Sequence, residues 1–226
     1  GIYSVRLFKH GDWREVVCDT LIPCGVDEKP LLATCKNENE MWAPLVQKAY
    51  AKLHGSFDSL HQGSIANALV ELTGGAVDIH DLSTEKTQAE INSGILWDRL
   101  MRYKSWCYLM VTVFETPMDD DECDGGITPN IAYTILDVRD EMGHKLIRLR
   151  NHWGEREWNG AWADYAEEWE KPNSIGLLEK LDYNFNADGT FWIHFNDFVV
   201  NFSKLYVCRL FPAGWEQITV KSEWRP

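Results

Sequence analysis

Three things are scarce in this sequence: patterned cysteines, basic residues and long apolar runs. The six cysteines form no Cys-x-x-Cys pair, which argues against a zinc or dithiol motif and against a small disulfide scaffold. Lysine and arginine total 22 against 35 acidic residues, and the formal charge of −13 argues against a nucleic-acid partner. No stretch approaches the roughly 20 apolar residues of a membrane-spanning helix. We expect a reduced, intracellular, folded protein that begins inside a longer polypeptide.

The first half of the chain carries the patterns of a β-hairpin followed by helices. Two β-branched and aromatic runs, Ile2–Phe8 and Trp13–Cys18, flank a turn at Gly11, which predicts a hairpin. From Met41 to Leu53 apolar residues recur at three- and four-residue spacing, which predicts an amphipathic helix. Two more helices are predicted, at 64–72 and, as one continuous helix, at 83–103.

The second half of the chain is rich in predicted strands. These β-branched and aromatic runs lie at 106–114, 131–138, 145–150, 190–195 and 204–210. Strands that follow helices, instead of alternating with them, indicate an α+β fold with an antiparallel sheet. We expect one lobe over 1–226, with a leading hairpin at 1–35, a mainly helical part at 36–104, and an antiparallel sheet with Trp-rich loops at 105–226.

A candidate site follows the strand predicted at 145–150. The chain continues there as Asn151-His-Trp-Gly154 and then as a loop rich in tryptophan and carboxylates. Thiol proteases need a thiolate, an imidazole and a third group that orients the imidazole ring. Asn151 suits the third role, with Trp153 as a lid that shields the hydrogen bond from water. The alternative is that Asn151 caps a turn before Gly154 and that the tryptophans belong to the core.

The tract from Asn151 to Asp164, with its regularly placed Trp and Gly residues, resembles the signature of the calpains. Other stretches resemble calpain segments in the same order along the chain, at 15–23, 41–56, 72–75 and 188–198. The resemblance implies a papain-like protease core, of which this chain is the second lobe. In an active calpain that lobe carries histidine and asparagine. The nucleophilic cysteine belongs to a preceding lobe, in a Gly-x-Cys-Trp context that no cysteine here reproduces.

The resemblance places Ile131 at the position of the histidine, because Asn130-Ile-Ala-Tyr133 aligns with the family's Gly-His-Ala-Tyr motif. A hydrocarbon side chain neither accepts nor donates a proton, so most of the thiol activation is lost. His152 adjoins Asn151, but the alternation of a strand directs its side chain to the opposite face. We interpret His152, His144 and His194 as ordinary exposed or core histidines.

The resemblance also implies a calcium site formed by Glu157, Asp164 and Asp188 from two adjoining loops. Hard oxygen ligands of this kind, completed by backbone carbonyls near residue 186 and by water, suit the coordination of calcium. Thr190 stands where the family tends to have a carboxylate, which reduces the expected affinity. The alternative is that these are ordinary loop acids.

The acidic loop at 117–126 looks superficially like the start of an EF-hand. Its twelfth position is Ile131, where an EF-hand has a bidentate glutamate. We interpret this stretch as a solvated loop with weak attraction for cations.

We interpret the chain as a calpain-like lobe with its protease site disabled at Ile131, used as a scaffold, a regulator or a peptide-binding module. Expected partners are a peptide or protein and the upstream cysteine-bearing lobe. By resemblance we also expect cytoskeletal proteins and a cytoplasmic, cytoskeleton-associated location. The rival hypothesis is an active calcium-dependent endopeptidase that retains Asn151 and Trp153 and recruits His152 as its base. A third is a calcium sensor without proteolysis.

Overall fold

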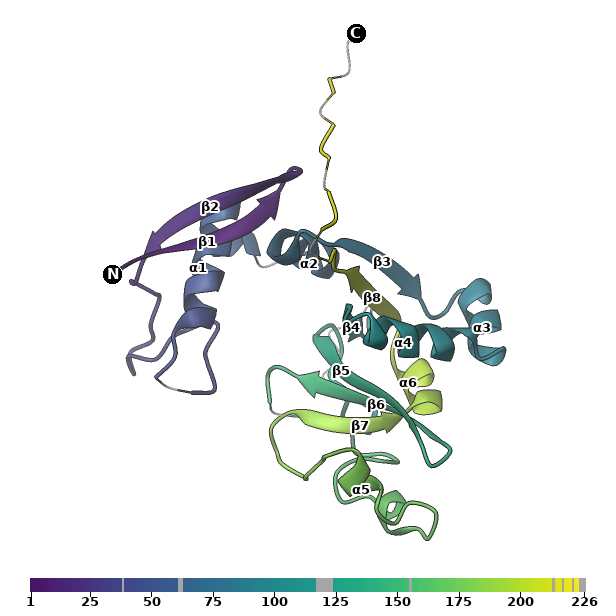
Figure 1. Cartoon of the computed structure of the whole chain (residues 1–226). Helices are drawn as coiled ribbons and strands as arrows, with labels where there is room; N and C mark the ends of the chain where they lie inside the picture. The colour runs from purple at the N-terminus through teal and green to yellow at the C-terminus, as the bar shows by residue number, and fades with distance from the viewer. Residues whose placement is uncertain are drawn as a thin grey trace. The chain divides into compact units, whose positions relative to one another are not determined.

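The computed structural model describes residues 1–37, 39–60, 63–116, 124–154, 156–212, 214–216, 218–220 and 222–223. The chain forms two compact units, one of residues 1–76 with 211–226 and the other of residues 77–210 (Figure 1). The sequence analysis divided the chain at 35 and 104 by type of secondary structure, whereas these units are defined by compactness. The predicted division therefore stays a prediction. Most of the EF-hand-like loop, residues 117–123, lies outside the described residues.

The first unit contains the predicted hairpin. Strand β1 (Ile2–Lys9) pairs antiparallel with β2 (Asp12–Asp19). The two-residue turn has positive φ at His10 (54°) and at Gly11 (80°), as tight hairpin turns with the right-handed twist of their strands require. One side of the hairpin buries Leu7 against Ala49 of the following helix.

Two helices follow in this unit, both as predicted. Helix α1 (Trp42–His54) ends at Gly55, and a 3₁₀ turn, η1 (Asp58–Leu60), leads toward α2 (Ile65–Thr73). Ser64 caps the start of α2, where its side chain accepts the backbone N–H of Asn67, and Gly74 caps its end in the left-handed conformation. Such a polar N-cap and glycine C-cap satisfy backbone groups that have no partner inside the helix.

The second unit contains the sheet, with strands in the order β3-β8-β4-β5-β6-β7 (Figure 1). The strands are β3 (Ala76–Asp81), β4 (Leu109–Val113), β5 (Ala132–Glu141), β6 (His144–Asn151), β7 (Thr190–His194) and β8 (Lys204–Arg209). The β8–β4, β4–β5, β5–β6 and β6–β7 pairings are antiparallel. The α+β class with an antiparallel sheet is therefore confirmed, as are the five predicted strands. The strand β3, inside the stretch expected to be mainly helical, was not predicted.

The predicted continuous helix at 83–103 is wrong. The chain forms α3 (Glu85–Asn92) and α4 (Ile95–Ser105), separated at Gly94, which has φ of 79°. A residue in the left-handed conformation cannot continue a right-handed helix. The helix therefore breaks at Gly94, although the spacing of apolar residues continues through it. Three short helical turns and one further helix complete the unit: η2 (Asp124–Gly126), η3 (Glu167–Glu170), α5 (Leu177–Lys180) and α6 (Phe195–Asn201).

Both faces of the sheet are covered. Alternate residues of β6 separate into two cores, because successive strand side chains point to opposite faces. Ile147 and Leu149 pack in the larger core with residues of α4 and α6. Leu146 packs in the smaller core, under the aromatic rings of Trp162 and Trp169. Three of the loop tryptophans, Trp158, Trp162 and Trp169, are buried, which agrees with the alternative that the tryptophans belong to the core, whereas Trp153 is exposed. Among the described residues, no helix is long and apolar enough to cross a membrane.

Candidate functional site

The β5–β6 ladder positions the residues of the candidate site. Tyr133 pairs directly with Asn151, the last residue of β6. Ile131 lies two residues before Tyr133, just ahead of β5, and packs partly buried against the larger core. Strand alternation therefore places Ile131 on the same side of the ladder as Asn151. The two positions that the resemblance assigned to histidine and asparagine come together, and one of them is a hydrocarbon.

Asn151 is 2% exposed, and its side chain organises the turn that follows. Its Oδ1 accepts the backbone N–H of Trp153 at 3.0 Å, and its Nδ2 donates to the carbonyl of Arg156 at 3.0 Å. Because one partner is a donor and the other an acceptor, the amide has one orientation. The turn-capping alternative is thus what this structure displays, while a role of Asn151 in orienting an imidazole stays a prediction.

His152 points away from Asn151, as strand alternation predicts. Its Nε2 lies 2.7 Å from the hydroxyl of Thr134, and Thr134 pairs with Arg150 on the opposite face of the ladder. The residue is exposed, yet nearby atoms desolvate the ring enough to lower its pKa, and the charge of Arg150 acts in the same direction.

The other two histidines considered from sequence have structural partners. His144 pairs with Glu141 at the far end of β6, and its ring packs at a tilt against that of Trp162, with ring centroids 4.6 Å apart. The Nδ1 atom of His194 accepts the N–H of Asn196 and so caps α6. In the part of the chain that the structure describes, no histidine is hydrogen-bonded to the Asn151 amide.

The backbone of Trp153 is fixed by a hydrogen bond, whereas its side chain is exposed. Its N–H is bonded to Asn151, but 74% of the residue is exposed to solvent. Its use as a lid over the site stays a prediction.

Two of the predicted calcium ligands meet at the turn before β7. Glu157 accepts the backbone N–H of Gly189 through Oε1 at 2.7 Å, and Asp188 accepts the N–H of Thr190 through Oδ1 at 3.1 Å. Both carboxylates therefore brace the entry of β7 through backbone hydrogen bonds.

Asp164 has both oxygens engaged. Its Oδ1 accepts the hydroxyl of Tyr183 at 2.6 Å, and its Oδ2 accepts the backbone N–H of Asn186 at 3.1 Å. The Tyr183 hydroxyl also approaches the carbonyl of Thr190 at 2.8 Å, which links Asp164 to the same strand. The sequence did not single out Tyr183.

The three acids are close enough to influence one another's ionisation. Burial raises the pKa of Glu157, and the charges of Asp164 and Asp188 raise it further. Burial also raises the pKa of Asp164, the Asp188 charge adds to this, and hydrogen bonds from Tyr183 and Asn186 oppose it without cancelling it. A cation would relieve this repulsion, so the donor chemistry fits calcium. Within the described ranges, however, no group of three such side chains is arranged to hold a metal ion.

Gly189 is a further site residue that the sequence analysis missed. Its φ is 80°, and an added Cβ would lie 2.3 Å from the carbonyl oxygen of Asn151. That contact exists because the Gly189 carbonyl accepts the N–H of Asn151 at 2.7 Å. The only sequence signal was the Asp-Gly-Thr order, which is typical of a turn before a strand.

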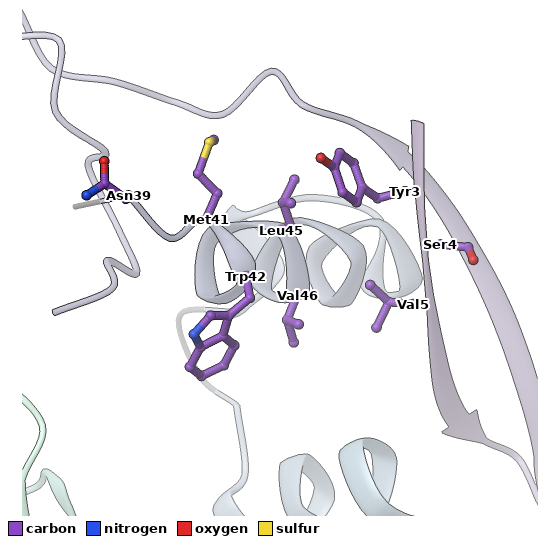
Figure 2. Close-up of a pocket in the computed structure, with 8 residues that line it drawn as sticks. All are labelled: Tyr3, Ser4, Val5, Asn39, Met41, Trp42, Leu45 and Val46. Carbon is purple, nitrogen blue, oxygen red and sulfur yellow. The ribbon is translucent and has the colours of Figure 1, made fainter. Parts of the chain in front are cut away.

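A cavity of about 420 Å³ lies in the first unit, between β1 and α1. Figure 2 shows its lining, which includes Tyr3 from the strand and Trp42 and Leu45 from the helix. None of the predicted site residues lines this cavity.

Comparisons with known proteins agree with this arrangement. The model of the calpain family cysteine proteases matches residues 1–209. The chain is 39% identical to the calpain-type cysteine protease DEK1 of Zea mays and 40% identical to DEK1 of Arabidopsis thaliana. Each match spans 100% of this chain but 10% of the relative. The chain is also 32% identical to Calpain-5 of Mus musculus, over 99% of the chain and 38% of that protein. The chain belongs to the calpain family of cysteine proteases.

Proposed function

We propose that this lobe is proteolytically inactive and that it serves its polypeptide as a scaffold, a regulator or a peptide-binding module. The observation that carries the proposal is the position of Ile131. It lies two residues before Tyr133, the partner of Asn151, and so on the same face of the β5–β6 ladder as Asn151. A cysteine protease activates its thiol through an imidazole at such a position. An isoleucine there supports packing and performs no proton transfer.

The surroundings of Asn151 support the same conclusion. The amide is occupied by backbone groups of its own turn, so its retention has a structural reason without catalysis. His152, the nearest alternative base in sequence, is bonded to Thr134 on the other face. Its recruitment would require breaking that bond and reversing the direction of the side chain.

The second candidate function is an active endopeptidase of the calpain type. It is favoured by the relatives, which are named cysteine proteases, and by the retention of Asn151 at the strand end. The chain covers 10% of the plant relatives, so a nucleophile would come from another part of the full-length polypeptide. His152 would then have to supply the base.

A peptidase assay on the full-length polypeptide with calcium separates the two functions. We expect no turnover of a fluorogenic peptide by the natural sequence, and turnover in Ile131→His if an upstream cysteine is present. The control Ile135→His, which places an imidazole four residues further along, inside β5 and deeper in the core, should stay inactive. Turnover by the natural sequence that disappears in His152→Ala would overturn the proposal in favour of the second candidate.

Calcium binding is part of the proposal, with Glu157, Asp164 and Asp188 as ligands. Their side chains would have to turn from their present hydrogen bonds to meet at one ion, because the described residues hold no ready group of three ligands. Bound calcium would neutralise three carboxylates that repel one another. A calcium sensor without proteolysis would need only this property. Titration calorimetry with calcium tests it, and heat that is absent at millimolar concentrations or unchanged in Asp188→Ala would remove calcium from the proposal.

The partners of such a module follow from the family alone. We propose a peptide or protein ligand, the upstream lobe of the same polypeptide, and a cytoskeletal association in the cytoplasm. Co-sedimentation of the full-length protein with actin filaments or microtubules tests the last of these.

A further inference from the structure

Two arginines on one face of β6 have no acidic partner. Arg148 and Arg150 alternate with Ile147 and Leu149, which are buried in the larger core. The arginines therefore share the opposite face of the strand, the face that carries Leu146. Both are partly buried, and neither forms an ion pair within the described part of the chain.

The cross-strand neighbours of Arg150 are hydroxyl residues. Thr134 of β5 lies on one side and Thr190 of β7 on the other. Arg148 lies opposite Asp137 of β5, whose carboxylate is paired with Lys104 and Arg139, and opposite Trp192 of β7. Its own contact is aromatic, because its Cζ lies 4.9 Å from the centre of the Tyr183 ring. Such a contact uses the flat face of the guanidinium and leaves its N–H edge available.

The Nε atoms of both arginines are buried and lack a hydrogen-bond partner. This is unusual, since most buried polar atoms have an acceptor or donor nearby, and an unpaired one costs free energy. Other partly buried arginines of the same unit are paired, Arg99 with Glu90 and Arg139 with Asp137. Three other buried side-chain atoms of the described residues also lack a partner, on His80, Ser174 and Trp192. The two arginines differ from these because a guanidinium always carries charge, and an anion that reaches them would supply the missing acceptor.

The nearby acid is not available as that acceptor. Asp164 is close enough to Arg148 for their charges to interact, but its two oxygens are bonded to Tyr183 and to the backbone of Asn186. No ion pair joins Asp164 to either arginine among the residues described.

We propose that Arg150 and Arg148, with the hydroxyl of Thr134, bind an oxyanion of the phosphate class, either as a free ion or on a phosphorylated side chain. The Thr134 oxygen lies 2.7 Å from Nε2 of His152, so its proton is available to the anion in the tautomer in which that Nε2 carries the hydrogen and donates it. Guanidinium groups present N–H forks that match such oxygens in pairs. Two forks and a hydroxyl suit an anion with three terminal oxygens better than a carboxylate with two. The site lies on the face of β6 opposite Asn151, and it stands independently of any proteolytic activity.

Arginine Nε–Hε resonances in ¹H–¹⁵N spectra of the chain report on this site directly. We titrate inorganic phosphate and, separately, O-phosphoserine, against sodium chloride at matched ionic strength. The expected result is a saturable shift of the Arg148 and Arg150 signals with a dissociation constant of ~1 mM or below. The exposed Arg102, whose Nε faces the carbonyl of Asp98, is the internal control.

Variants assign the effect to these residues. Arg150→Lys keeps the charge but loses the fork, and we expect affinity to fall about tenfold or more; Arg102→Lys should bind as the natural sequence does. Thr134→Val leaves both arginines in place and should weaken binding about threefold, which keeps the test valid if Arg150→Lys is poorly folded. Tighter binding of O-phosphoserine assigns a phosphorylated side chain as the ligand, and tighter binding of phosphate assigns the free ion. Three results would overturn the proposal: shifts of the Arg148 and Arg150 signals that rise linearly with anion concentration, shifts that are equally large with sodium chloride, or shifts that are equally large at Arg102.

Discussion

Tyr133 and Asn151 lie directly opposite each other at the end of the β5–β6 ladder, and each fixes a loop. The Tyr133 hydroxyl accepts the N–H of Thr128 at 2.8 Å, while the Asn151 amide bonds the backbone of Trp153 and Arg156. Both side chains are almost fully buried. The end of the ladder is therefore a structural junction, whatever chemistry takes place above it.

Asn151→Ala should destabilise the protein by ~2–3 kcal/mol, because it removes two hydrogen bonds made by a buried amide. The amide of Trp153 should exchange its hydrogen faster in the variant, since its acceptor is lost. Urea unfolding and hydrogen exchange measure the two effects. The control Asn173→Ala removes an exposed amide whose hydrogen-bond partner among the described residues is the ring of His144, and it should change stability by less than ~0.5 kcal/mol. Equal effects of both variants would contradict the structural role.

Gly189→Ala and Gly143→Ala form a matched pair. The two glycines have φ of 80° and 84°, but a Cβ at Gly189 would meet the Asn151 carbonyl at 2.3 Å, whereas one at Gly143 meets nothing within 4 Å. Both variants carry the strain of alanine at positive φ, about 1 kcal/mol. We expect Gly189→Ala to cost at least ~2 kcal/mol more in urea unfolding, because backbone cannot move aside as a flexible side chain does. Similar losses of stability in the two variants would contradict this expectation, because they would show that the backbone of the turn before β7 can shift to accept a Cβ.

Glu157→Gln should stabilise the calcium-free protein at neutral pH. The folded-state pKa of Glu157 lies above its ordinary value of 4.5, through burial and the charges of Asp164 and Asp188. The ionised group therefore opposes folding above its folded-state pKa, and this effect is absent below 4.5. We expect a gain of up to ~1 kcal/mol, small because the group is partly solvated.

Glutamine keeps the acceptor for the Gly189 N–H, so the comparison isolates the charge. Thermal unfolding at pH 7 measures the gain, and the same variant should bind calcium more weakly if the proposed site is correct. Glu170→Gln, in η3, serves as the control. A loss of stability in Glu157→Gln would mean that the negative charge itself supports the fold.

Glu71 should make the first unit sensitive to acid. Burial alone would raise the pKa of Glu71, but hydrogen bonds with Tyr50 at 2.6 Å and His54 at 2.7 Å, together with the charge of Lys9, lower it below 4.5. The carboxylate thus contributes stability above pH 4.5, and the contribution is lost as the pH falls through its folded-state pKa.

The variant Glu71→Gln should therefore lose roughly 2 kcal/mol at pH 7, from hydrogen bonds to a charged group, and the difference from the natural sequence should shrink toward pH 3. Urea unfolding at successive pH values measures it. The exposed Glu15 of β2 provides the control Glu15→Gln. A difference that grows as the pH falls would reverse the sign of the argument.

Local patterns predicted much of the fold. The hairpin followed from alternating residues around Gly11, and α1 from its three- and four-residue spacing, because these signals depend only on neighbours in the chain. The same reasoning failed at Gly94, where periodicity continues across a break. It also failed at β3, which pairs with β8 more than a hundred residues later in the chain. Such a pairing leaves no local signal.

The sequence by itself determined which chemistry is present: the asparagine tract, the isoleucine at position 131, the three loop acids and the calpain resemblance. Only the tertiary structure decided how they meet. The ladder register places Ile131 and Asn151 on one face and His152 with Thr134 on the other. It also leaves Arg150 between two threonines and brings Gly189 against the Asn151 backbone. The physical reason is that strand pairing is selected by burial and by hydrogen bonds between distant segments, and a shift of one residue would reverse every face.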